Sequence, residues 1–217
     1  MVLLIAGQAR EGICMHALIN GAIQCFVTDT HGGDVWQNLL RHAGLDSAGF
    51  ETLLRHDPSL TQSLIDAGAC VLQRPKAEML EDIGTYLVSH PHVEALRRLL
   101  RFGGEGYVDF LHSLDDLHDR ARLAVSDLDL PELELHDHAA DRFSLQCMTG
   151  APYRPDTALQ GFGHVMMGVL RAMADDYGAL VVLELASGRT GCEVIEISLI
   201  EQGYSAGRQF DLGRRAG

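Results

Sequence analysis

Residues 107–125 read YVDFLHSLDDLHDRARLAV, and the pattern of this stretch decides how the chain is interpreted. On an α-helix, residues three, four and seven positions apart share one face. One flank of such a helix therefore collects Tyr107, Leu111, Leu114, His118, Ala121 and Val125. His112 projects instead with the acidic residues at positions 109, 115 and 116. The spacing predicts one helix over 107–125, with His118 on its apolar face and His112 on its solvent side.

A histidine on a dry helix face suits an axial iron ligand. The neutral ring offers one nitrogen to a metal and can donate a hydrogen bond from the other. The same placement is also typical of a core or boundary histidine that bonds to a backbone carbonyl. Periodicity shows where a side chain lies and not what it does, so the local pattern leaves both interpretations open for His118.

The whole of residues 15–125 follows helical periodicity. Apolar residues recur at helical spacing from Met15 until residues 31–33 (His-Gly-Gly) end the pattern, and again around Trp36. Each later helical pattern has a proline near its start, where proline is tolerated. These patterns cover residues 59–73, 76–89 and 91–102. The first part of the chain is therefore predicted to be all helical.

Pro131 marks a change to strand patterns. Leucines at 133 and 135 alternate with acidic residues, and the apolar residues 143, 145 and 147 alternate with polar ones, as in half-buried strands. A helix over 159–177 and strands over 180–185 and 193–200 follow, with a turn at 187–191 between the strands. The fold class is α+β: an N-terminal helical half followed by a four-stranded antiparallel sheet that carries one helix.

Composition limits the partners and the compartment. The chain has 217 residues, enough for one sizeable core, and 30 acidic against 17 basic residues give a net charge of −13. Such a surface repels phosphate, so we expect no nucleic-acid partner and no binding to an anionic membrane.

Five scattered cysteines form no CxxC pair and fit a reducing, cytoplasmic location. We expect a peripheral extension at 1–14, one domain over 15–200 and a flexible tail at 201–217.

Three motifs resemble the H-NOX (haem–nitric oxide/oxygen binding) family, which includes the haem module of soluble guanylate cyclase. They are MHALIN at 15–20, GDVW at 33–36 and SLDDLH at 113–118, and they occur in the family's order. The resemblance covers about residues 15–200. It implies haem b as cofactor, with His118 as the axial iron ligand and Pro131 pressing on the porphyrin. It also implies that the haem is lined by Ile19, Ile23, Leu80, Leu87, Leu114, Thr149, Val165 and Val169.

One departure from the family concerns the haem propionates. The family carries a Tyr-x-Ser-x-Arg motif on the second strand, whereas this chain has CMTGA at 147–151, where only the hydroxyl of Thr149 is comparable. A shifted register gives YRPDT at 153–157, which matches only the tyrosine. Losing the guanidinium removes a bidentate, charge-assisted clamp. A second hypothesis is therefore a haem-free relative that binds a protein or an apolar ligand.

The resemblance also implies a gas preference and a signalling role without catalysis. Family members that bind oxygen stably place a tyrosine where this chain has Val165. Without a distal donor, bound oxygen gains no hydrogen bond, so we expect a sensor of nitric oxide or carbon monoxide that discriminates against oxygen. Tyr86 is the one alternative donor, although an amphipathic boundary role is more typical of such a tyrosine. The partner expected from the family is a histidine kinase or a cyclic-di-nucleotide enzyme.

Other patterns predict no site. His136 and His138 point to the same side of a strand but have no visible third metal ligand. Gly161-Phe-Gly163 resembles a phosphate loop only faintly, because no βαβ unit surrounds it. Methionines at 166, 167 and 173 have the spacing of core residues, and Cys147 is better interpreted as a buried inert cysteine than as a redox switch.

Overall fold

The computed structural model describes residues 15–46, 50, 58–91, 94–101, 103–124, 130–149, 161–186, 188 and 191–207. The helices that come first are α2 (Met15–His31), α3 (Gly33–His42), α5 (Pro58–Leu72), α6 (Lys76–Ser89), α7 (Glu94–Arg101), α8 (Tyr107–His112) and α9 (Leu117–Ala124). They are followed by β1 (Glu132–Ala139), β2 (Arg142–Met148), α10 (Phe162–Tyr177), β3 (Leu180–Ala186) and β4 (Cys192–Glu201). This order confirms the predicted α+β class. No helix in the described ranges is both long and apolar enough to span a membrane.

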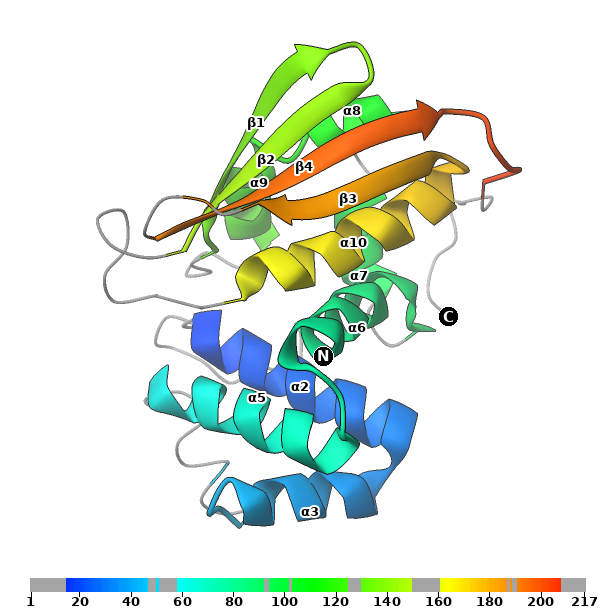
Figure 1. Ribbon diagram of the computed structural model, residues 1–217. Coiled ribbons are helices and arrows are strands. Elements are labelled where there is room, and N and C mark those ends of the chain that lie inside the picture. Colours follow the sequence, from blue (N-terminus) through cyan, green and yellow to red (C-terminus); the bar gives the residue numbers. More distant parts are fainter. Residues whose placement is uncertain are drawn as a thin grey trace.

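The strands form one antiparallel sheet in the order β1-β2-β4-β3. Figure 1 shows α10 lying along one face of this sheet, with α6 crossing below it and α2, α3 and α5 forming a separate layer at the far end. Leu145 and Cys147 of β2 point into the core at 0% exposure, between more exposed neighbours such as Gln146. The predicted alternation of β2 is therefore confirmed at Gln146, whereas Ser144 is also buried, at 4% exposure, where its hydroxyl bonds to His138.

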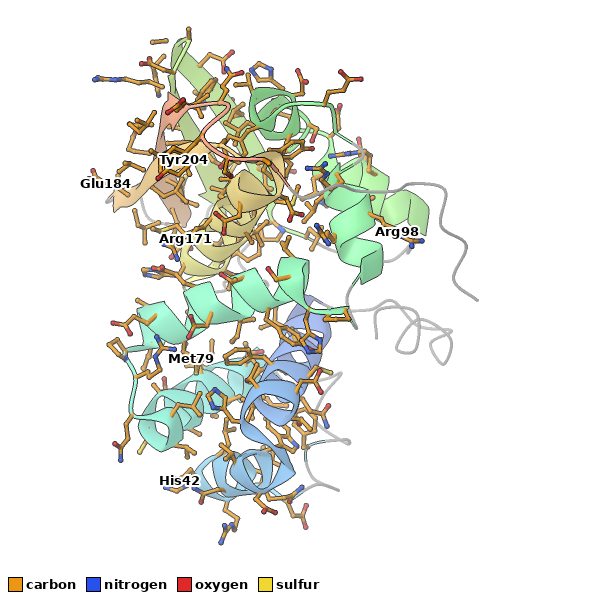
Figure 2. All side chains as sticks on the ribbon, turned by 90° about the vertical axis from the view of Figure 1, so that its right-hand side faces the viewer. His42, Met79, Arg98, Arg171, Glu184 and Tyr204 are labelled. Carbon is orange, nitrogen blue, oxygen red and sulfur yellow. The ribbon has the colours of Figure 1, made fainter. Side chains whose placement is uncertain are left out.

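Two hydrophobic clusters hold these layers together. The sheet cluster lies between the sheet, α8 and α10 and includes Phe110, Leu114, Leu145, Val169 and Leu170. The helical cluster lies among α2, α3, α5 and α6 and includes Ile23, Leu39, Leu64, Met79, Leu80, Ile83 and Val165. In Figure 2, Met79 lies between α6 and the helices below it. Val165 belongs to the helical cluster although it sits on α10, so α10 contributes to both cores.

The predicted helix over 107–125 is wrong as one element, because residues 113–116 form a turn between α8 and α9. The hydroxyl of Ser113 donates to the carbonyl of Phe110 at 2.7 Å, and the carboxylate of Asp115 accepts the backbone N–H of Leu135 at 2.7 Å. The second bond comes from strand β1, so helical periodicity could not reveal it. The apolar flank survives the break, with Leu111 and Leu114 at 0% exposure.

Helix α10 begins at Phe162 instead of the predicted residue 159. Gly161 has a left-handed φ of 88°, which glycine adopts without strain. The carboxylate of Glu193 accepts the N–H groups of Gly161 at 3.0 Å and Gly163 at 2.7 Å. A carboxylate at a helix N-terminus satisfies unpaired donors and complements the helix dipole. Both N–H groups are therefore bonded within the protein.

Helices α6 and α10 cross in direct backbone contact. A Cβ at Gly84 would lie 2.0 Å from the carbonyl oxygen of Val165, and one at Gly168 would lie 2.0 Å from the carbonyl oxygen of Glu81. At the edge of the crossing, the Glu81 carboxylate also contacts His164 at 3.3 Å and Arg171 at 3.0 Å. Glycine is therefore required at both positions for this approach.

We expect Gly84→Ala to lower the free energy of unfolding by about 3 kcal/mol, because the added methyl group must push α10 away from α6. Urea unfolding measures the change. Gly33→Ala is the matched control, since its Cβ would meet no atom within 4 Å at the start of α3. Equal stability of the Gly84→Ala variant and the wild type would contradict the described crossing.

Candidate functional site

His118 lies in the first turn of α9 and is half-buried. Its Nδ1 is 3.1 Å from the backbone carbonyl oxygen of Leu130. A carbonyl oxygen only accepts, so Nδ1 must donate and the neutral ring carries its free lone pair on Nε2. This bond fixes the orientation of the ring and its tautomer, which is the outer-shell support typical of a metal-bound imidazole. It is also the bond expected of a boundary histidine, so the geometry is compatible with both interpretations of His118.

The surroundings of His118 are apolar. Leu114, Leu117 and Ala121, on the same turn and helix, are exposed by 0%, 7% and 2%. Pro131 is also buried and directly follows the residue whose carbonyl binds the imidazole. The structure therefore brings the predicted Pro131 next to the chain segment that orients His118. Val125, the last member of the predicted flank, lies outside the described residues.

The residues predicted to line the cofactor are divided between the two clusters. Ile23, Leu80 and Val165 are buried members of the helical cluster, and Leu87 packs against it. Val169 and Leu114 belong to the sheet cluster. Ile19 packs against both clusters. These apolar residues therefore come from both clusters, and their role in lining a cofactor stays a prediction.

Thr149 follows β2 and is 5% exposed. Its backbone N–H donates to the carbonyl oxygen of Gly191 at 2.9 Å, which continues the contact between the ends of β2 and β4. Residues 150–160, which include Tyr153, Arg154 and Thr157, lie outside the described part of the chain. The prediction that Thr149 contacts a propionate therefore stays a prediction.

The Tyr86 hydroxyl is already hydrogen-bonded within the protein. It donates to Oδ2 of Asp29 at 2.6 Å, and its ring stacks on His90 with the ring centroids 4.7 Å apart. Burial, followed by the bond to Asp29, raises the pKa of the Tyr86 phenol well above its ordinary value. Tyr86 is therefore a boundary aromatic that joins the C-terminal ends of α2 and α6, and its hydroxyl is not directed to a ligand.

Two features of the site were missed from the sequence. The first is the carbonyl of Leu130, because a backbone acceptor leaves no trace in side-chain patterns. The second is Asn20 of α2, a polar residue that is 0% exposed between the apolar Ile19 and Ile23. An amide within an otherwise apolar helical stripe was the available signal for Asn20.

The remaining histidine, methionine and cysteine patterns can be placed in the described residues. His136 pairs with Glu134 and His138 with the hydroxyl of Ser144, and no group of three potential metal ligands occurs in the described ranges. The three methionines of α10 are core residues with at most 7% exposure. Cys147 is fully buried, and burial raises the pKa of its thiol.

Comparison with known proteins agrees with this geometry. The family model described as Haem-NO-binding matches residues 16–185. The soluble guanylate cyclase gcy-32 of Caenorhabditis elegans is 26% identical over 180 residues, which are 81% of this chain and 25% of the cyclase. The cyclase gcy-31 of the same organism is 24% identical over 172 residues, 79% of this chain and 23% of that protein. The chain thus spans about a quarter of the length of these relatives.

Solved structures show the same fold. The unliganded Fe(II) H-NOX protein of K. algicida superposes with a TM-score of 0.68 at 14% identity, covering 88% of this chain and all of the other. A mutant of the T. tengcongensis H-NOX superposes with a TM-score of 0.65 at 15% identity, covering 87% of this chain and 99% of the other. The α+β architecture is therefore shared. The chain belongs to the Haem-NO-binding (H-NOX) family.

The family implies a haem, and the described residues fit one. His118 offers an oriented imidazole whose Nε2 carries the lone pair. The predicted lining residues Ile23, Leu80 and Val165 are buried and apolar, as a porphyrin face requires. The buried amide of Asn20 has no hydrogen-bond partner in the described part of the chain, and a buried group of this kind requires its own explanation.

We expect alkylation to separate the described cysteines by burial. In the folded protein at pH 8, iodoacetamide should modify the exposed Cys70 and spare Cys147, because burial keeps the latter as an unreactive thiol. Peptide mass spectrometry measures both sites, and unfolding in urea should make them equally reactive. Rapid labelling of Cys147 in the native protein would contradict its placement in the core.

Proposed function

We propose that this chain is a haem-based sensor of a diatomic gas that prefers nitric oxide over oxygen and signals to a separate protein. The observation that carries the proposal is the half-buried His118 imidazole, held by the Leu130 carbonyl so that Nε2 is its free nitrogen. Membership of the Haem-NO-binding family supplies the chemical class of the cofactor. Haem, when bound, would supply the iron at which a diatomic gas is held.

In this proposal the protein holds and orients the group and keeps water away. His118 would bind the iron, and the buried Leu114 and Pro131 would support its imidazole. Ile19, Ile23, Leu80, Leu87, Val165 and Val169 would cover the other side, and Thr149 would lie at the edge. An apolar cover of this kind favours a neutral diatomic ligand over water and ions.

The same contacts offer a route for a signal. His118 is tied to Leu130 beside the start of β1, and Asp115 in the turn before α9 is tied to Leu135 within β1. Displacement of the imidazole would therefore pull on β1, which is an edge strand of the sheet. An edge strand and the adjoining turn are accessible to a second protein. Following the family, a histidine kinase or a cyclic-di-nucleotide enzyme is the partner we propose.

The preference for nitric oxide is supported by the side chains near the gas. Val165 and Leu87 are apolar, and the Tyr86 hydroxyl is engaged by Asp29. A side of the haem without a tyrosine donor gives polarised oxygen less stabilisation, whereas nitric oxide and carbon monoxide depend less on such a bond.

We expect protein expressed with haem supply to show a Soret absorption band. His118→Gly should lose the band or shift it, because the iron loses its protein ligand, and added imidazole should restore the spectrum. His112→Gly is the matched control: His112 is exposed, six residues away, and pairs with Asp137 at 3.2 Å. We expect the His112→Gly spectrum to match the wild type.

The opposite results would identify the alternative function. A stable, colourless protein, or a Soret band that is identical in wild type and His118→Gly, would contradict the sensor proposal. A colourless protein that still binds a partner kinase would instead indicate a haem-free interaction module.

We expect Tyr86→Phe to leave the nitric oxide and oxygen spectra unchanged and to lower the free energy of unfolding by about 1.5 kcal/mol, the value of a hydrogen bond to a charged group. Absorption titration and urea unfolding measure the two effects. A large change in oxygen binding would show that the hydroxyl reaches the gas, against the bond to Asp29 described above.

A further inference from the structure

The face of the sheet that points away from α10 carries exposed apolar side chains on β3 and β4. Val181 and Leu183 of β3 pack against the sheet cluster, so the alternate residues of this strand point the other way. Val182 and, by the same alternation on β4, Ile200 point outward and are 48% and 60% exposed. In Figure 2, the side chain of Glu184 also points away from the helices. We define the β3–β4 face by its outward residues, which are Val182, Glu184, Ala186, Val194, Glu196 and Ile200.

The centre of the β3–β4 face is a pair of like charges. Glu184 and Glu196 are directly opposite each other in the register of the two strands, and both are exposed. Neither carboxylate has an ion pair or a hydrogen bond in the described part of the chain. Like charges directly opposite each other on neighbouring strands are destabilising. A cation from another molecule would relieve this repulsion.

Apolar side chains lie on both sides of the carboxylate pair. Ala186 and Val194 are opposite each other one row along the strands, and Val182 with the diagonal Ile200 lies on the other side. Rows on one face of a sheet are about 7 Å apart, and residues four positions apart on a helix are about 6 Å apart along its axis. A helix with a lysine or arginine between apolar residues at these steps would match the face in charge and in spacing.

A hollow adjoins the carboxylate pair on the same face. It has a volume of 390 Å³ and is lined by His138, Arg142, Glu196 and Ser198. Ser198 is directly opposite Val182, so the hollow is continuous with the β3–β4 face. A hollow beside an exposed apolar patch can receive an anchoring side chain from a partner.

We propose that the β3–β4 face binds an amphipathic helix of the signalling partner, whose lysine or arginine pairs with Glu184 and Glu196 while its apolar residues cover Val182 and Ile200. The inference rests on the part of the proposed function that assigns a separate signalling protein, and it does not require haem. The net charge of −13 favours a basic partner over a second copy of this chain.

The test uses a synthetic alanine-rich helical peptide as the probe, with a central lysine and a leucine four residues to either side. A second peptide carries glutamate in place of the lysine. Amide ¹⁵N–¹H correlation spectra of the whole labelled chain report which residues each peptide contacts. We expect the lysine peptide to shift the amide signals of β3 and β4, and the glutamate peptide to leave them unchanged.

Variants of the chain separate a specific contact from a general effect of charge. Glu196→Lys should weaken binding of the lysine peptide about tenfold, because an attractive contact becomes repulsive. Glu132→Lys is the matched control with the same change in net charge, since Glu132 is an exposed carboxylate on the same face of the sheet, opposite Met148. Ile200→Ser should also weaken binding, because the apolar contact is part of the site.

Three results would overturn the inference. Equal effects of Glu196→Lys and Glu132→Lys would show that only net charge matters, and shifts confined to other elements, or no shifts, would place no helix on this face. Dimerisation in sedimentation experiments that Ile200→Ser abolishes would assign the face to a second copy of the chain. None of these results bears on the Soret test of the proposed function, so the two failures are distinguishable.

Thermal unfolding gives a second readout that needs no peptide. Glu196→Gln should raise the midpoint, because it removes the repulsion from Glu184, whereas Glu132→Gln should leave the midpoint unchanged. A lower midpoint for Glu196→Gln would show that the carboxylate is already bonded within the folded chain, and would overturn the inference.

Discussion

The hydrogen bond between Nδ1 of His118 and the carbonyl of Leu130 is the contact on which the rest of the account depends. Its two atoms are 3.1 Å apart, and it joins the first turn of α9 to Leu130, the residue before Pro131 and β1. A carbonyl acceptor selects the tautomer with its lone pair on Nε2, and the buried Leu114, Ala121 and Pro131 keep the region apolar. An imidazole oriented with its Nε2 lone pair free is suited to binding iron. Because Leu130 lies just before β1, the same bond links the position of the ring to the sheet.

The residues predicted to line the other side of the cofactor belong largely to the helical cluster. The sheet cluster includes residues of α8 and of the turn before α9, whereas the helical cluster includes residues from the middle of α2. The two halves meet where α6 and α10 cross at Gly84 and Gly168, with no room for a side chain on either. A flat cofactor between them would contact both halves at once. Such an arrangement allows a small displacement at the iron to alter how the two halves pack.

Much of the fold could be predicted from the sequence, because many of its elements follow from local periodicity. The four strands, helix α10 and the apolar flank of His118 all follow from spacing, and the exposed position of His112 does too. The single helix over 107–125 was wrong because Asp115 bonds to Leu135, a contact between residues twenty positions apart. Likewise, Glu193 on β4 sets the start of α10. The polar side chain of Asn20 within an apolar stripe was visible in the sequence, but its lack of hydrogen-bond partners is a property of the folded chain alone.

The central claim is that His118 is bound to iron through Nε2. Resonance Raman spectroscopy of the ferrous, gas-free protein tests it most directly, with protein prepared in natural-abundance form and with ¹⁵N-labelled histidine. We expect a low-frequency iron–histidine stretching band that shifts on labelling and is absent from His118→Gly. A haem-loaded protein without an isotope-sensitive band, or one whose band persists in His118→Gly, would contradict the account.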